Sequence, residues 1–446
     1  MKKKTLIILL IILVLILAAV LLIRNRSTEE GQKILNIVSI WDGSRSKDPS
    51  GELDFSNSSM TVRKERDGFL RGIQDCPSDI IIDETLIPEE GNMADINNML
   101  ADVYNYVDTL LTVGASTEIV TMYSAMGSEF FNIPMLIPFS DGDVSISDSV
   151  GSTFRITVSG DQYTDFVGNY IAPKDTVMNL STFFFGDDPA QDIDIRTGIF
   201  FADDFNGHDT AVKVAQTLMD HGFDIEYYSS YDIGGVLPTL EAAWRKDEAR
   251  LRDLDVVFIF GKDQDSFSDL MDVVDYWDDR TTFVLIGYVP EIDEPELYAA
   301  ENIFMLEQDL DLSQCPADIT TNGEALAYAA GYITKMVVAR AAAEQPPEKS
   351  GLQLWFKNVD EKHRIHQDYV DSFRNRVRTK LSELDEYIPC FGNLRLTSGS
   401  NESIKLELVR YVSQSQTEKA DNYEVYNRIY QRLNQKYGTG TVNGAN

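Results

Sequence analysis

Residues Thr197–Tyr228 read TGIFFADDFNGHDTAVKVAQTLMDHGFDIEYY. The first six are a short apolar run that favours a strand, and Gly207–His221 repeats its apolar residues at helical spacing. Asp224–Tyr228 again favours a strand. Two strands joined by a crossing helix lie parallel, and the crossover is right-handed. This stretch therefore predicts one unit of a parallel sheet.

The same alternation continues on both sides of this unit. Downstream, helix, strand, helix and strand are expected at Leu237–Leu251, Val256–Phe260, Ser266–Trp277 and Phe283–Gly287. Upstream, strands are expected at Ile34–Ile40, Ile80–Leu86, Thr109–Val113 and Pro134–Pro138, and helices at Met60–Ile73, Met93–Val107 and from Ser116. Two further helices are expected at Glu324–Glu344 and Asp368–Leu384. Two series separated by an irregular stretch predict an α/β chain with two doubly wound parallel-sheet lobes.

The amino terminus predicts a membrane anchor. Residues Thr5–Ile23 are 19 positions without a charge, and a helix of that length covers about 28 Å, close to the hydrocarbon thickness of a bilayer. Three lysines precede it, which places residues 1–23 as a cytoplasmic tip and transmembrane helix, with the bulk of the chain outside the cell. The alternative is a cleaved signal peptide, but the run is longer than a usual signal and no small-x-small site follows it. Residues 24–32 are polar and read as a tether.

Length and charge limit the function. The 446 residues suit an anchor and two lobes. The excess of 72 Asp and Glu over 39 Lys and Arg gives a formal charge of −33. Such a surface repels phosphate backbones and anionic headgroups, so nucleic acid is not expected as a partner.

Cysteine, histidine and acidic motifs do not assemble a recognisable catalytic set. Cys315 and Cys390 could pair outside the cytoplasm and leave Cys76 buried and free. His363 and His366 are three apart without a further ligand nearby. DxD triplets at 192–194, 263–265 and 309–311 are common by chance in so acidic a chain. Without a phosphate loop or a GxSxG motif, we expect neither an enzyme nor a cofactor or metal.

Four segments resemble one known family. Residues 113–145 read VGASTEIVTMYSAMGSEFFNIPMLIPFSDGDVS, and FRITVSGDQ, GIFFADDFNG and FGNLRLTSGS follow at 154–162, 198–207 and 391–400. In this order they resemble the type I periplasmic binding proteins, which include branched-chain amino-acid-binding proteins and receptor ligand-binding regions. The resemblance spans roughly residues 33–412.

That resemblance implies two lobes that close about a hinge on a small ligand. Residues 33–156 with about 320–400 would form lobe 1, and residues 157–312 would form lobe 2. Residues 401–446, expected to hold a strand and a helix around Asn422–Lys436, are not explained by it.

Candidate ligand contacts in lobe 1 follow its strands. Ser116 and Thr117 open a helix, where hydroxyls and free N–H groups form an anion site, although they could equally serve as an N-cap. The resemblance implies that Ser116 and Thr117 bind a carboxylate of the ligand, as the matching residues do in the family. Asp141, next to Ser140, stands where the family has a carboxylate-binding Thr, and a carboxylate there would repel that of an amino acid.

Two residues after the first strand could complete this side of the cleft. Arg45 could pair with Asp141, and Trp41 could supply an aromatic wall.

Lobe 2 also departs from the family pattern. Asp204 and Phe205 are its plausible contacts, while Asp263 stands near the position of an expected aromatic residue and Tyr288 near that of an expected acid. A branched-chain amino acid is therefore not the expected ligand, and a polar or cationic solute suits the acids better.

The leading hypothesis is a tethered solute receptor that serves an ABC-type permease and touches the bilayer through residues 5–23. A sensor or scaffold ectodomain of the same fold, signalling through a membrane partner, is the second. Because doubly wound pairs also carry glycosyltransferases, a two-lobed enzyme is the third.

Overall fold

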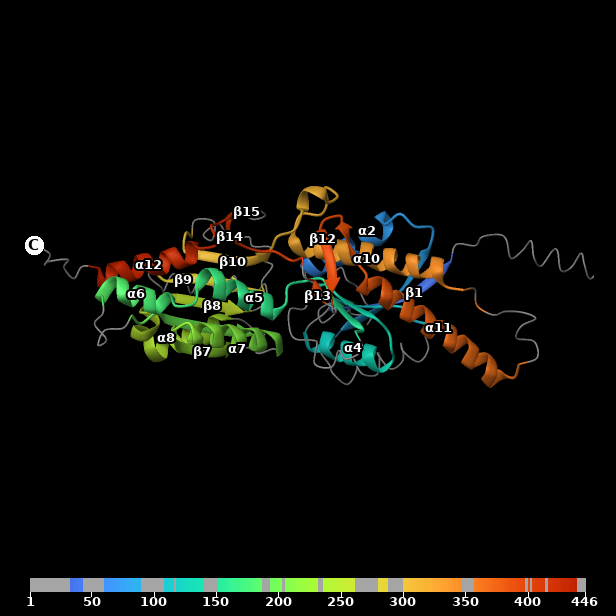
Figure 1. The fold of residues 1–446 in the computed structure, drawn as a ribbon, viewed down its shortest axis with the longest axis horizontal. Helices are drawn as coiled ribbons and strands as arrows, with labels where there is room; N and C mark the ends of the chain where they lie inside the picture. The colour runs from blue at the N-terminus through green and yellow to red at the C-terminus, as the bar shows by residue number, and fades with distance from the viewer. Residues whose placement is uncertain are drawn as a thin grey trace, which may run out of the picture.

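The two predicted alternations form two separate sheets, arranged end to end along the long axis of the computed structural model (Figure 1). The structure describes residues 33–42, 60–89, 108–115, 118–139, 151–186, 193–202, 205–231, 236–260, 280–287, 300–346, 348, 357–397, 400–401, 403–413 and 416–438. No helix within these ranges is long and apolar enough to span a membrane, and residues 5–23 lie outside them.

Lobe 1 is built on a five-stranded sheet in the order β2-β1-β3-β4-β5, with every pair parallel. Its strands are β1 (Ile34–Asp42), β2 (Ile81–Glu89), β3 (Thr112–Ala115), β4 (Met135–Ile137) and β5 (Thr153–Arg155). Helices of the lobe are α2 (Met60–Asp75), α4 (Glu118–Phe130), α10 (Asn322–Glu344) and α11 (Val359–Ser382). Short strands β11 (Asp385–Ile388), β12 (Gly392–Thr397) and β13 (Ser400–Asn401) form a small antiparallel sheet beside them.

Lobe 2 repeats this plan and extends it. Its parallel strands run in the order β7-β6-β8-β9-β10, and β14 and β15 continue the sheet in antiparallel orientation beyond β10. The strands are β6 (Arg196–Ala202), β7 (Asp224–Tyr231), β8 (Val256–Phe260), β9 (Thr282–Ile286), β10 (Ile303–Gln308), β14 (Leu406–Ser413) and β15 (Gln416–Lys419). The helices are α5 (Gly160–Phe166) with its π-helical continuation η3 (Val167–Ile171), α6 (Thr176–Phe185), α7 (Phe205–Asp220), α8 (Val236–Arg252) and α12 (Glu424–Tyr437).

Burial on both faces explains the continuous apolar strands of lobe 2. Every residue of β8 and of β9 is buried. Parallel sheets take helices on both faces, so their central strands are apolar at successive positions instead of alternating. This is why VVFIF and TFVLI could be recognised from the sequence as strands.

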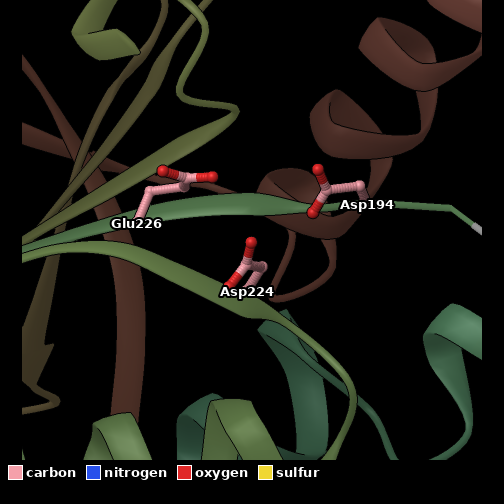
Figure 2. A group of neighbouring side chains, drawn as sticks. All are labelled: Asp194, Asp224 and Glu226. Atoms are coloured by element: carbon pink, nitrogen blue, oxygen red, sulfur yellow. The ribbon is translucent and has the colours of Figure 1, made fainter.

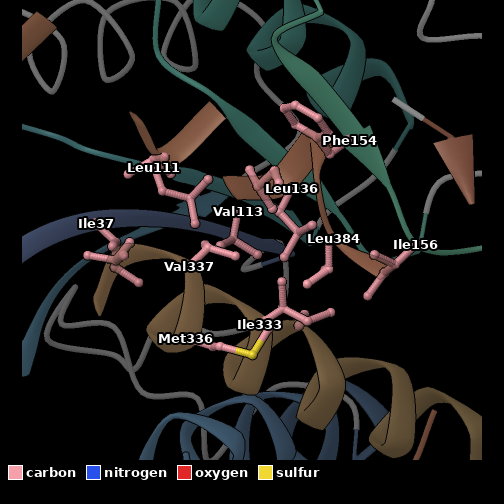
Figure 3. Packing of buried hydrophobic residues seen from close by; sticks show 14 of the residues in the cluster. Ile37, Leu111, Val113, Leu136, Phe154, Ile156, Ile333, Met336, Val337 and Leu384 are labelled. Carbon is pink, nitrogen blue, oxygen red and sulfur yellow. The ribbon is translucent and has the colours of Figure 1, made fainter. Parts of the chain in front are cut away.

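The core of lobe 1 lies between its sheet and α10. Figure 3 shows Ile37, Val113 and Leu136 of three strands above Ile333 and Val337 of that helix. On its other side α10 lies against α2 at very short range. A Cβ on Gly72 would collide with the carbonyl oxygen of Tyr328, and one on Gly331 with that of Phe69, so these glycines are what allows the two helices to cross so closely.

The chain crosses between the lobes three times. The crossings follow β5, β10 and β13, and they lead to α5, α10 and β14. Gln162 Nε2 donates to the carbonyl oxygen of Asn401 (3.1 Å), and the Asp309 N–H donates to that of Lys405 (2.8 Å). The three segments thus lie side by side, as a hinge requires.

Most of the predicted elements that the structure describes are confirmed within a few residues, and β8 matches exactly. α11 differs most, because it begins at Val359 and not at Asp368. The Asn358 side chain accepts a hydrogen bond from the Glu361 N–H, and the Glu361 side chain accepts one from the Asn358 N–H. The sequence already contained this capping box. No sequence pattern predicted β5, α5, α6, β10, β11 or β15. The helices predicted at Met93–Val107 and Ser266–Trp277 lie outside the described residues.

A disulfide joins Cys315 to Cys390, and Cys76 is free and buried. Cys315 follows the 3-10 helix η5 (Leu312–Gln314) on the second crossing, and Cys390 lies in the turn between β11 and β12. Tyr387 Oη adds a bond to Asp311 Oδ2 (3.0 Å). The second crossing is therefore fastened to lobe 1, and its freedom is concentrated near the end of β10.

Reduction of the disulfide should destabilise lobe 1. The two cysteines are 75 residues apart, and releasing a loop of that size gives the unfolded chain about 4 kcal/mol of entropy. Urea unfolding with and without a phosphine reductant measures the loss. The double variant C315S/C390S should match the reduced protein and ignore the reductant. An unchanged midpoint for the reduced wild type would contradict this bridge.

Candidate functional site

Both sheets have the same reversal of strand order, and this reversal indicates where a ligand would bind. Each has the order 2-1-3-4-5 in its parallel part, so strand order reverses between β1 and β3 in lobe 1 and between β6 and β8 in lobe 2. Ligands of open parallel sheets bind beyond the carboxyl ends of the strands at such a reversal. The fold therefore defines one candidate half-site in each lobe.

These half-sites lie on the facing sides of the lobes. α4 begins three residues after β3 ends, and α7 begins three residues after β6 ends. The two helices contact one another between the lobes, and both lie along the same side of the molecule in Figure 1. The helices that follow the two carboxyl edges therefore meet between the lobes.

Most of the predicted contact residues follow the strands at the reversals. Trp41 is the penultimate residue of β1, and Phe205 is the first of α7, directly beyond β6. The other predicted contact residues lie outside the described residues, shortly after the ends of β1, β3, β4, β6, β8 and β9: Arg45, Ser116, Thr117, Ser140, Asp141, Asp204, Asp263 and Tyr288. Their roles stay predictions.

The side chain of Trp41 is buried, whereas an aromatic residue that lines an open cleft would be partly exposed. Its side chain is 1% exposed and lies edge-on to Phe69 (5.7 Å between centroids) and Phe139 (6.1 Å). Its indole N–H has no acceptor among the described residues. In the sheet Trp41 pairs with Ala115, the last residue of β3. The ring therefore lies at the reversal point of lobe 1, where the sequence predicted an aromatic contact.

A charge network beside Trp41 was not foreseen from the sequence. Arg66 of α2 makes two bonds of 2.9 Å to the carboxylate of Glu84 on β2, and the buried Ser39 hydroxyl of β1 donates to the same carboxylate. The Arg66 guanidinium also lies 5.9 Å from the Trp41 ring centroid. One carboxylate thus ties α2 to both strands and fixes the surroundings of the indole.

An acidic cluster in lobe 2 lies at the other end of the sheet. Asp194, Asp224 and Glu226 bring carboxylate oxygens within 4.8 Å of one another (Figure 2). Burial, followed by the charges of Asp194 and Glu226, raises the pKa of Asp224. β6 and β7 begin here, whereas ligands of parallel sheets bind where strands end.

Two arginines of the protein pair with the carboxylates of this cluster. Arg196 Nε lies 3.0 Å from Asp194 Oδ2, and Arg250 forms an ion pair with Glu226. Asp194 is the last residue of the triplet 192–194, so this motif contributes to a network of partly exposed ion pairs at the edge away from the half-sites.

Glu307 is another residue near a half-site that was not predicted from the sequence. It is the penultimate residue of β10, at the carboxyl edge of lobe 2, and it is 8% exposed. Burial and, secondarily, the charge of Glu407 raise its pKa to about 7. No sequence motif marks it, because its neighbour Glu407 is 100 positions later in the chain.

No protein-family model matches the sequence, and no curated protein matches it. Solved structures do match. An ABC transporter substrate-binding protein from Desulfitobacterium hafniense, in complex with Leu, has a TM-score of 0.54 at 12% identity, over 87% of this chain and 100% of the other.

Two further matches agree with the first. An extracellular ligand-binding receptor from Rhodopseudomonas palustris gives a TM-score of 0.59 at 8% identity, over 88% of this chain and all of the other. A substrate-binding periplasmic protein from Ralstonia solanacearum gives 0.58 at 14%, over 86% and 100%. The chain thus has the fold of the type I periplasmic binding proteins, which confirms the fold that the sequence resemblance implied.

Arg66→Ala should destabilise lobe 1 by about 2–3 kcal/mol, because it leaves the carboxylate of Glu84 half-buried without its cation. Arg66→Lys should cost less, since it keeps the charge and loses the two-pronged geometry. Urea unfolding measures both. Arg71→Ala is the matched control on the same helix: its pair with Asp75 is exposed, so a change within about 0.5 kcal/mol is expected. Equal effects of Arg66→Ala and Arg71→Ala would contradict the assignment.

Proposed function

We propose that this protein is an extracytoplasmic receptor that encloses a small solute between its lobes, and that it supplies the solute to an ABC-type permease. The observation that carries the proposal is the pair of strand-order reversals, one per lobe, whose carboxyl edges are followed by α4 and α7, helices that meet between the lobes. Three side-by-side crossings allow these edges to separate and close. Neighbours of the same fold are named as ABC transporter substrate-binding proteins, which supports a role in binding without turnover.

The ligand we propose is polar or cationic. Acids follow the strands where the family places an uncharged hydroxyl or an aromatic ring: Asp141 after β4 and Asp263 after β8. A carboxylate disfavours a ligand carboxylate and favours an ammonium or hydroxyl group. The neighbours from Desulfitobacterium hafniense and Streptococcus pneumoniae were solved with Leu and Isoleucine, and the departures above argue against such apolar amino acids here.

A thermal-shift screen of the full chain in detergent tests this proposal. Amino acids, amides, polyamines and sugars form the panel, and a true ligand at 100 times its Kd should add about 2.7 kcal/mol of stability. Asp204→Ala should abolish the shift. Asp220→Ala, at the exposed end of α7, should preserve it. A panel in which no solute raises the midpoint, or a full shift in Asp204→Ala, would argue against the proposed site.

We further propose that residues 5–23 anchor the protein in the membrane with the lobes outside. The intact mass of the purified protein should include residues 1–23, and alkaline carbonate should leave the chain in the membrane pellet. Protease added to whole cells should digest the lobes, and removal of residues 1–24 should make the protein extractable. A mature mass that lacks the segment would favour a cleaved signal, and protection from external protease would contradict the orientation.

A further inference from the structure

The end of β10 carries two glutamates that face one another. Glu307 of β10 and Glu407 of β14 are direct partners in the antiparallel pair, so their side chains lie on the same face of the sheet at short range. Like charges in such a pair repel. Lys419 of β15 lies 2.6 Å from Glu407 Oε2 and balances that carboxylate. Glu307 has no described cation of its own in ion-pair distance.

Glu307 instead makes a hydrogen bond to the other lobe. Asn322 Nδ2, on the first residue of α10, donates to Glu307 Oε2 at 3.1 Å. Glu307 belongs to the lobe 2 sheet, and α10 is the central helix of lobe 1. The bond therefore spans the second crossing, between the segment that the disulfide holds on lobe 1 and the strand that leaves lobe 2.

The charged groups around this bond come from each neighbouring element. β14 contributes Glu407, β15 contributes Lys419, and β10 itself continues to Asp309, whose charge acts on Lys419. On the side of lobe 1, Lys64 of α2 lies 3.9 Å from Glu324 of α10, and that carboxylate is already taken up by the N–H groups of Thr320 and Thr321. The described part of β9 is uncharged. Glu65 of α2 also reaches this end of α10, where its carboxylate lies beside Gly323. Among the described residues, Glu407 is the charge that raises the pKa of Glu307.

We propose that Glu307 and Asn322 form a proton-controlled latch between the lobes, which holds the present lobe arrangement when Glu307 is protonated and releases it when Glu307 ionises. A protonated Glu307 can stay buried opposite Glu407 without repulsion, and its carbonyl oxygen still accepts the bond from Asn322, although that bond by itself is stronger to the ionised carboxylate. An ionised Glu307 is stabilised by moving into water, and rotation of the lobes about the crossings breaks its bond to Asn322 and permits that hydration.

The direction and range of the pH effect follow from the two states of Glu307. In the latched state its pKa is about 7, and hydration in the open state lowers it towards the ordinary value of 4.5, which the facing Glu407 of the same lobe keeps it from reaching. Between the pKa values of the two states the open arrangement loses a proton that the latched one keeps. The ratio of latched to open molecules therefore falls as the pH rises towards 7, by less than about 300-fold in total, and stays constant at higher pH.

Distance measurements between the lobes test the latch. Spin labels at Met126→Cys on α4 and Met219→Cys on α7 occupy exposed positions of opposite lobes, while Cys76 is buried and the other two cysteines are bridged. Pulsed electron resonance on the full chain in nanodiscs, from pH 4.5 to 8.5, should show the distribution changing up to pH 7 and constant above it. Circular dichroism at each pH confirms that the protein stays folded.

Three variants separate the latch from other causes. Glu307→Gln keeps an acceptor for Asn322 without a charge, so it should hold the low-pH distribution throughout. Asn322→Ala should shift the distribution towards the open form even at low pH. Glu301→Gln, an exposed glutamate on the same lobe (84% side-chain exposure), should behave as wild type. A wild-type distribution that ignores pH, or a pH response that survives in Glu307→Gln, would overturn the latch.

This inference rests on the hinge movement of the proposed function but needs no ligand. A solute that stabilises the protein while the inter-lobe distances ignore pH would overturn the latch alone. Lobes whose separation responds neither to pH nor to any solute of the panel would overturn both.

Discussion

A parallel sheet covered by helices on both faces meets water mainly where its strands begin and end. Both sheets of this protein obey that constraint, as the uninterrupted burial of β8 and β9 shows. All parallel strands of a sheet end at one edge, so that edge collects the loops and helix amino termini that can recognise a ligand. Where strand order reverses, neighbouring loops diverge to opposite faces and leave room between them. The rest of the molecule serves to hold two such edges opposite each other.

The crossings carry this arrangement. They are linked to one another by Gln162, Asn401 and the backbone at Asp309, and the disulfide fixes one of them to lobe 1. In the proposed closing movement, the few residues next to β10 would have to change, where a buried glutamate meets an asparagine of the opposite lobe. Polar contacts there are suited to reversible movement, since each loses one hydrogen bond on opening and regains it from water.

The described ion pairs lie mainly where they stabilise the fold, away from the carboxyl edges at which a ligand would bind. The acids at the amino ends of β6 and β7 are matched by Arg196 and Arg250, and Glu84 is matched by Arg66. The arginine pairs of lobe 2 stabilise the sheet edge away from the strand-order reversal. The pair of Arg66 and Glu84 stabilises the surroundings of Trp41 in lobe 1. The high net negative charge of −33 is thus compatible with ordered ion pairs at these partly buried carboxylates, whereas the buried Glu307 has no such described pair.

The sequence by itself determined most of the longer parallel strands, most helices and the division into two lobes, because apolar runs and helical periodicity are local consequences of burial. The segment VVFIF is the clearest case, since each residue is buried. It also placed Phe205 just beyond a strand, and it placed Trp41 in a loop that is instead the last part of β1. Only the tertiary structure decided which distant residues meet: Arg66 with Glu84, Cys315 with Cys390, and Glu307 with both Glu407 and Asn322. Such contacts depend on strand order and register between segments up to 100 residues apart, and local periodicity carries no information about either.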